Sequence, residues 1–104
     1  MDQLSPPATA RPVILCLSGA GLALGRELEK TLDADIHGHA VRCPDAPHHF
    51  GKARAHIADL FCSGRPIIGV CAAGILIRAV APHLKHKSTD PPVIAVAESG
   101  RFVV

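Results

Sequence analysis

Residues 13–21 read Val13-Ile14-Leu15-Cys16-Leu17-Ser18-Gly19-Ala20-Gly21, a continuous apolar run that ends in a glycine-rich turn. An apolar run of this length, bounded by glycines, is typical of a strand that is buried on both faces of a sheet. Residues 22–32 then place leucines at roughly helical spacing among charged side chains, which predicts an amphipathic helix. Together the two elements form a strand–turn–helix unit, the repeating unit of α/β proteins.

The same alternation of strand and helix continues along the chain. We expect a short strand near a sheet edge over 36–41, a proline-containing loop over 42–49, a helix over 50–62, a strand over 66–70, an apolar helix over 71–84 and a strand over 93–97. Ser99-Gly100 predicts a tight turn into a last strand, 101–104. The sequence therefore predicts a three-layer α/β/α sandwich, with a mainly parallel sheet of four to five strands and a C-terminal antiparallel hairpin.

The length and composition fit one domain. A chain of 104 residues builds one core, and 48% hydrophobic with only 3% aromatic residues means a core of aliphatic side chains. Residues 1–11 include Ser5, Pro6 and Pro7 with few apolar side chains, so we expect a disordered leader. A single α/β domain over 12–104 should follow it.

Charge and cysteine usage exclude several classes of partner. Eleven Lys and Arg against nine Asp and Glu give a net charge of +2, too small to indicate a nucleic-acid partner. The longest apolar stretch, 67–81, is interrupted by Arg78 and is shorter than the ~20 residues of a membrane span. No secretory signal precedes it, and the four cysteines are scattered without a CxxC pair. We expect a cytoplasmic protein with reduced thiols, no cofactor and no membrane contact.

Histidine and cysteine give two weak candidates for chemistry. His37 and His39 share a strand face, and His48 and His49 follow in the loop, a set that could hold a divalent metal. Their spacing matches no recognised metal geometry, so we favour solvated histidines and predict no metal site. Cys71 at a helix start could be a reactive thiolate, but no histidine is placed as its base, and a small buried residue is the better interpretation.

The carboxyl ends of the strands are where an open α/β sheet binds ligands, which here means the turns at 18–21, 71–74 and 98–101. The glycines after the first strand lack GxGxxG spacing, so they do not indicate a dinucleotide site. The small residues of 71–74 would let helix-start N–H groups approach an anion, or would simply allow close packing. Arg78 lies on an otherwise apolar helix, where it either pairs with Asp90 or Glu98 or binds a ligand carboxylate.

A longer pattern resembles a known family. It consists of the run Gly69 to Pro82, then Lys85 and Lys87, then Thr89-Asp90-Pro91, then Glu98-Ser99-Gly100-Arg101-Phe102-Val103. This pattern resembles the cobalamin biosynthesis G family, hydrolases that open the δ-lactone of cobalt-precorrin-5A and release acetaldehyde. The same module also occurs fused to precorrin-3B methyltransferases. The resemblance implies a corrin precursor as ligand, a tetrapyrrole with several carboxylates that can itself carry cobalt.

Binding and opening such a lactone would need particular side chains, and the sequence offers candidates for them. The substrate-binding candidates are Ala73, Gly74, Arg78, Lys87, Ser99, Gly100 and Arg101. Asp90 and Glu98 are the candidate bases for activating water, and the N–H groups near Gly74 are candidate oxyanion donors. Alternatively, Asp90 merely caps a loop and Glu98 is an ordinary turn residue.

Members of this family continue beyond the position of Val104, so we expect a domain truncated at its C-terminal end and inactive alone. An unpaired strand edge would favour a homodimer or association with other cobalamin-pathway enzyme domains. Two further functions stay open. One is a noncatalytic accessory module of a ring-contracting methyltransferase, and the other is a flavodoxin-like structural or interaction domain.

Overall fold

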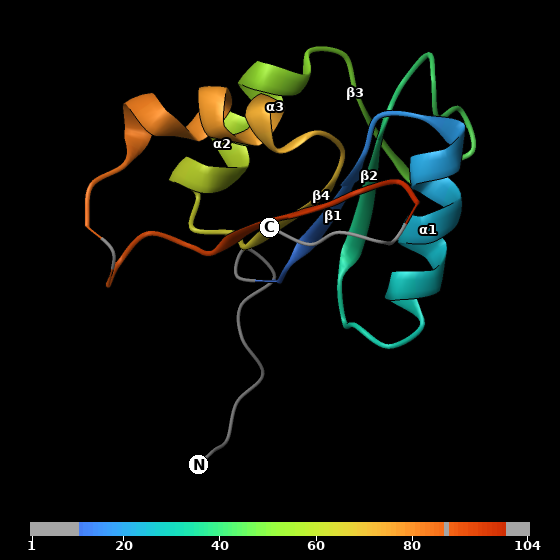
Figure 1. The fold of residues 1–104 in the computed structure, drawn as a ribbon, viewed down its shortest axis with the longest axis horizontal. Helices are drawn as coiled ribbons and strands as arrows, with labels where there is room; N and C mark the ends of the chain where they lie inside the picture. The colour runs from blue at the N-terminus through green and yellow to red at the C-terminus, as the bar shows by residue number, and fades with distance from the viewer. Residues whose placement is uncertain (1–10, 87, 100–104) are drawn as a thin grey trace.

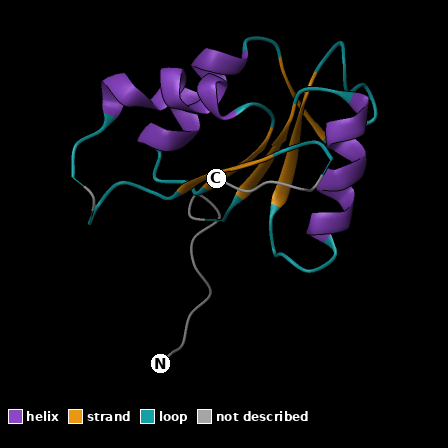
Figure 2. Cartoon of the chain, in the orientation of Figure 1, coloured by secondary structure: helices purple, strands orange, loops and turns teal. Residues whose placement is uncertain are grey.

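The structure, a computed structural model, describes residues 11–86 and 88–99, which form a five-stranded parallel sheet with helices on both faces (Figures 1 and 2). The elements in chain order are β1 (Val13–Cys16), α1 (Gly19–Glu29), β2 (Asp35–His39), β3 (His48–Phe50), α2 (Ala53–Cys62), β4 (Ile67–Val70), α3 (Ala73–Val80), the 3₁₀ turn η2 (Ala81–His83) and β5 (Val93–Val96). None of the helices in this part of the chain has the length and apolar character needed to span a membrane.

Strand β1 lies at the centre of the sheet and is fully buried, as its apolar run predicts. Its side chains alternate between two cores. Val13 and Leu15 belong to the core beneath α2 and α3, whereas Ile14 and Cys16 belong to the core beneath α1. Because one layer of helix covers each face, the predicted three-layer α/β sandwich is confirmed.

The strand order β3-β2-β1-β4-β5 contains one reversal of direction. The chain runs outward from β1 through β2 to β3, and α2 then carries it back to β4, on the other side of β1. The helices that follow the neighbouring strands β1 and β4 therefore leave on opposite faces of the sheet. Such a point is where open α/β sheets bind ligands, beyond the carboxyl ends of the strands.

Three expectations need correction. The antiparallel hairpin is not supported, because all five strands of the described chain are parallel and β5 pairs parallel with β4. The expected second strand of the hairpin, 101–104, lies outside the described residues. The segment 42–49 is not all loop, since β3 begins at His48 and pairs with β2. The helix expected over 71–84 divides into α3 and η2, because Pro82 lacks the N–H that would continue the α-helical ladder.

The amino ends of the strands are held together by an ion-pair network. Arg65 donates to Asp35 (2.6 Å), and Arg11 donates to Asp33 (2.8 Å) and to Asp35 (3.2 Å). Arg65 also donates to the backbone carbonyl of Arg11 (3.0 Å). Arg11, which the sequence placed in the leader, is therefore anchored to the sheet. Most of the expected leader, residues 1–10, lies outside the described residues.

Candidate functional site

The carboxyl edge of the sheet carries the candidate site. Helices α1, α2 and α3 all begin there, since each follows directly on β1, β3 or β4. The partial positive charges of their exposed N–H groups therefore gather along one edge. Within the described chain, the first turn of each of these helices contains no acidic residue that would neutralise this charge.

Glu98, one of the two predicted bases, lies at this edge in the loop after β5. Its Oε2 accepts a hydrogen bond of 2.8 Å from the hydroxyl of Ser18, the residue that caps α1. Strand β4 separates β1 from β5 in the sheet, so this bond passes across the carboxyl end of β4. Glu98 is thereby held beside the point where the strand order reverses, and its side chain is exposed to solvent.

The thiols of Cys71 and Cys43, which follow β4 and β2 at this edge, are buried. Burial raises the pKa of Cys71 to about 11, and the charge of Glu98 contributes to the increase. Burial also raises the pKa of Cys43, where Glu98 adds to the effect and Arg42 opposes it. The interpretation of Cys71 as a small buried residue is confirmed, because its thiol stays protonated at neutral pH.

The start of α3 provides backbone donors at the same edge of the sheet as Glu98. The residue before the helix is Ala72, whose side chain cannot cap it, so the N–H groups of Ala73 and Gly74 are available to an anion. Arg78 folds back toward this turn, since a Cβ atom built on Gly74 would lie 3.9 Å from Arg78 Nη1. A guanidinium therefore flanks the exposed N–H groups.

Arg78 is exposed rather than buried, contrary to the premise that burial would force it to find a partner. Its helix is buried only along the stripe of Leu76, Ala79 and Val80. Among the residues that the structure describes, Arg78 forms no ion pair with Asp90 or Glu98. The internal ion pair is not observed, and the guanidinium remains accessible to a ligand.

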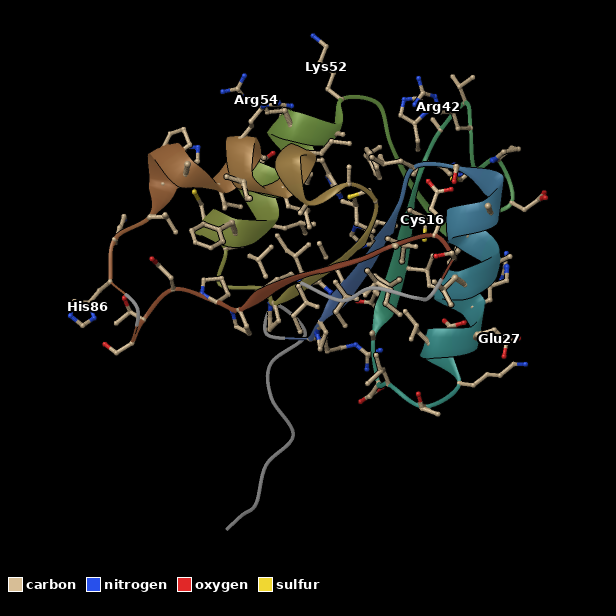
Figure 3. All side chains as sticks on the ribbon, in the orientation of Figure 1. Cys16, Glu27, Arg42, Lys52, Arg54 and His86 are labelled. Atoms are coloured by element: carbon tan, nitrogen blue, oxygen red, sulfur yellow. The ribbon has the colours of Figure 1, made fainter. Side chains whose placement is uncertain are left out.

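Further cations at this edge were missed by the sequence reasoning. Figure 3 shows Arg42, Lys52 and Arg54 along the top of the molecule, where β1 ends and α1 begins. Arg42 follows β2, Lys52 precedes α2 and Arg54 lies in its first turn. All three are exposed. A cation at a helix start opposes the helix dipole, and this was the local signal that could have singled out Lys52 and Arg54.

Asp90, the other predicted base, lies at the opposite edge of the sheet. It precedes β5, whereas Glu98 follows it, so the length of the strand separates them. Asp90 Oδ2 accepts from the backbone N–H groups of Lys85 (2.8 Å) and His86 (3.1 Å), which is the loop-capping role that the sequence left open. A surface hollow next to this loop is lined by Leu84, Lys85, His86, Asp90, Pro91 and Pro92.

The remaining predicted ligand contacts divide between described and undescribed residues. Ser99 follows Glu98 at the carboxyl edge and is exposed. Lys87, Gly100 and Arg101 lie outside the described residues. Ala73, Gly74, Arg78, Glu98 and Ser99 thus all lie on elements at the carboxyl edge of the sheet, and Asp90 lies at the other edge.

Three of the histidines form a cluster on the α2 side of the sheet. His37 Nδ1 lies 2.8 Å from His56 Nε2, and the ring of His48 lies 5.1 Å from that of His37. The ring of His56 stacks on Phe50 at 4.7 Å. The interpretation of His37 as a solvated histidine is therefore wrong, since its ring is half-buried against α2. No group of His, Cys, Asp or Glu suited to hold a metal occurs within residues 11–86 and 88–99.

The second half of the chain matches a known protein family. Residues 55–104, which include the start of α3 and Glu98, match the family described as "Cobalamin synthesis G N-terminal". Residues 55–104 of this chain belong to the cobalamin synthesis G N-terminal family. The resemblance noted in the sequence is thereby confirmed, although fusion to a methyltransferase stays a prediction.

Two curated relatives of this family member carry the name cobalt-precorrin-5A hydrolase. The protein from Priestia megaterium is 35% identical over 54 residues, which cover 52% of this chain and 14% of the relative. The protein from Salmonella typhimurium is 27% identical over 105 residues, which cover 100% of this chain and 29% of the relative. The chain thus spans less than a third of either relative. No solved structure matches it.

Proposed function

We propose that this cobalamin synthesis G N-terminal domain binds a corrin precursor at the carboxyl edge of its sheet. The observation that carries the proposal is the position of the Arg78 guanidinium beside the uncapped N–H groups of Ala73 and Gly74. A forked guanidinium and helix-start N–H groups both favour carboxylates, which corrin precursors bear around their rim. Arg42, Lys52 and Arg54 extend the same positive edge toward β3.

The chemistry that this edge supports best is opening of the cobalt-precorrin-5A lactone, with Glu98 as the general base. Glu98 would remove a proton from water while the water oxygen bonds to the lactone carbonyl carbon. The N–H groups of Ala73 and Gly74 would stabilise the oxyanion that develops. The bond from that carbon to the ring oxygen then breaks, and the proton returns to the departing alkoxide. Asp90 is less suited to this role, because both of its hydrogen bonds cap a loop at the other edge.

The experiment combines binding with product analysis. The chain is titrated with cobalt-precorrin-5A, binding is followed by the absorbance of the macrocycle, and acetaldehyde is measured in the same samples. Binding with acetaldehyde release would support the hydrolytic role. Binding without release would restrict the proposal to a ligand-binding module, and absence of binding would refute it.

Arg78→Ala tests the site within this proposal. We expect its affinity for cobalt-precorrin-5A to fall about tenfold, because a charged hydrogen bond contributes about 1.5–3 kcal/mol. The melting temperature should change little, since the side chain is exposed. Lys30→Ala is the matched control, an exposed cation at the opposite end of α1. Equal losses of affinity in the two variants would show that only net charge matters.

A further inference from the structure

Ser18 makes two hydrogen bonds that fix the direction of its hydroxyl group. Its oxygen accepts from the backbone N–H of Gly21 at 3.0 Å, which caps α1. A hydroxyl has one hydrogen, and the N–H of Gly21 has already taken a lone pair of its oxygen. The hydrogen is therefore donated to Glu98 Oε2, at 2.8 Å. The cap of one helix thus aims a donor at the carboxylate from another loop.

The position of this bond suits a ligand-facing carboxylate. Ser18 follows β1 and Glu98 follows β5, so the bond joins two loops across the end of β4. The charge of Glu98 acts on Cys71, after β4, and on Cys43, after β2. Among the described residues, Oε2 accepts from Ser18 and Oε1 accepts no hydrogen bond. Glu98 is exposed to solvent, so a water molecule can approach Oε1 while Oε2 keeps its bond to Ser18.

We propose that Ser18 is a positioning residue, which holds Glu98 over the crevice between β1 and β4 so that Oε1 faces the bound substrate. This inference rests on the proposed function of Glu98 as a base. The donor is a neutral hydroxyl, so Ser18 orients the carboxylate without neutralising its charge. A base fixed in this way needs no reorientation when water attacks, and a misplaced one costs rate rather than affinity.

Two substitutions separate this role from simple helix capping. Ser18→Thr keeps a hydroxyl that can both cap α1 and donate to Glu98. Ser18→Asp keeps the cap, since aspartate is among the preferred N-cap residues, but its carboxylate cannot donate and repels Glu98. If Ser18 only caps α1, both variants should behave as the wild type does.

The experiment has one arm that needs no ligand. In the free chain, the ¹⁵N heteronuclear NOE of the Glu98 and Ser99 amides reports how rigidly the loop after β5 is held. We expect a lower NOE in Ser18→Asp and wild-type values in Ser18→Thr, with α1 intact in both by circular dichroism. Unchanged NOE values in Ser18→Asp would overturn the proposal.

The second arm measures acetaldehyde release from cobalt-precorrin-5A. We expect kcat of Ser18→Asp to fall about tenfold or more with KM nearly unchanged. Ser18→Thr should keep most of the wild-type kcat. A rise in KM at unchanged kcat would overturn the positioning role. If the wild type itself binds cobalt-precorrin-5A without releasing acetaldehyde, the hydrolytic function fails, and the NMR arm still decides whether Ser18 holds Glu98.

Discussion

The His37–His56 pair makes the fold sensitive to mild acid. One nitrogen must donate and the other accept across the 2.8 Å between the rings, so two protonated rings would face each other as donors. Burial and the nearby charges of His56, His48 and Arg65 together lower the pKa of His37 to about 4, although Asp35 acts in the opposite direction. Burial lowers the pKa of His56 as well.

The sign and size of the effect follow from linkage. The unfolded chain protonates His37 near pH 6.5 and the folded chain near pH 4, so the unfolded state binds more protons between these values. Stability is therefore full above pH 6.5 and falls as the pH is lowered toward 4. This difference in pKa corresponds to about 3 kcal/mol, an upper bound for a ring that is partly exposed. Burial raises the pKa of Asp35, but the hydrogen bonds and charges of Arg65 and Arg11 outweigh it and hold that pKa below 3.8. Asp35 therefore does not titrate between pH 4 and pH 6.5.

The assay is urea unfolding followed by circular dichroism from about pH 7 to about pH 4.5, which gives the free energy of unfolding at each pH. His37→Asn is the informative variant, because its amide occupies the place of Nδ1 and does not titrate. We expect its stability to fall less steeply with acid than that of the wild type. His83→Gln removes a histidine outside the cluster and should keep the wild-type slope. Parallel pH profiles for wild type and His37→Asn would refute the reasoning.

Three further variants test packing, the amino-edge network and association. Gly25→Ala should lower the free energy of unfolding, measured in urea, by about 1–3 kcal/mol, because the new Cβ would lie 2.8 Å from a cysteine sulfur of β1. Gly19→Ala is the control and should not lower it, because nothing lies within 4 Å of a Cβ at that position. Arg65→Met should lower the free energy of unfolding by about 1.5–3 kcal/mol. The double variant with Asp35→Asn should lose less than the sum of the two single losses, and additive losses in the same assay would contradict a coupled pair. If the expected homodimer uses the β5 edge, Ile94→Lys should make it monomeric in sedimentation equilibrium, and an equally dimeric variant would exclude that edge.

Local patterns predicted the elements that local interactions determine. The run through β1 predicted a buried strand because only apolar side chains fit between two helical layers. The leucines after it predicted α1, and the small residues at 71–74 predicted the start of α3 at the correct edge. Strand β3 was missed because it has three residues and follows a proline-containing loop, which leaves no room for a periodic pattern.

The site depends on pairings that no local pattern contains. Ser18 and Glu98 are 80 residues apart, and the sequence named both turns without indicating that their side chains meet. The strand order decides this, because it places β4 between β1 and β5 and so brings the two loops over one crevice. Asp90 was grouped with Glu98 for the opposite reason, since the two are near in sequence but separated by the whole length of β5.

The separation of Arg78 from Glu98 at the carboxyl edge explains how one surface can bind the carboxylates of a ligand and also keep a carboxylate of its own as a base. An ion pair between Arg78 and Glu98 would satisfy both groups and leave neither for a ligand. In the described chain, Glu98 instead takes its hydrogen bond from a neutral hydroxyl, and the Arg78 guanidinium lies over the start of α3. A ligand with several carboxylates can then engage the guanidinium while a water molecule reaches Glu98. Charge reversal follows as a test, because Glu98→Lys should strengthen binding of the polycarboxylate and abolish its hydrolysis, whereas weaker binding would show that Glu98 itself contacts the macrocycle.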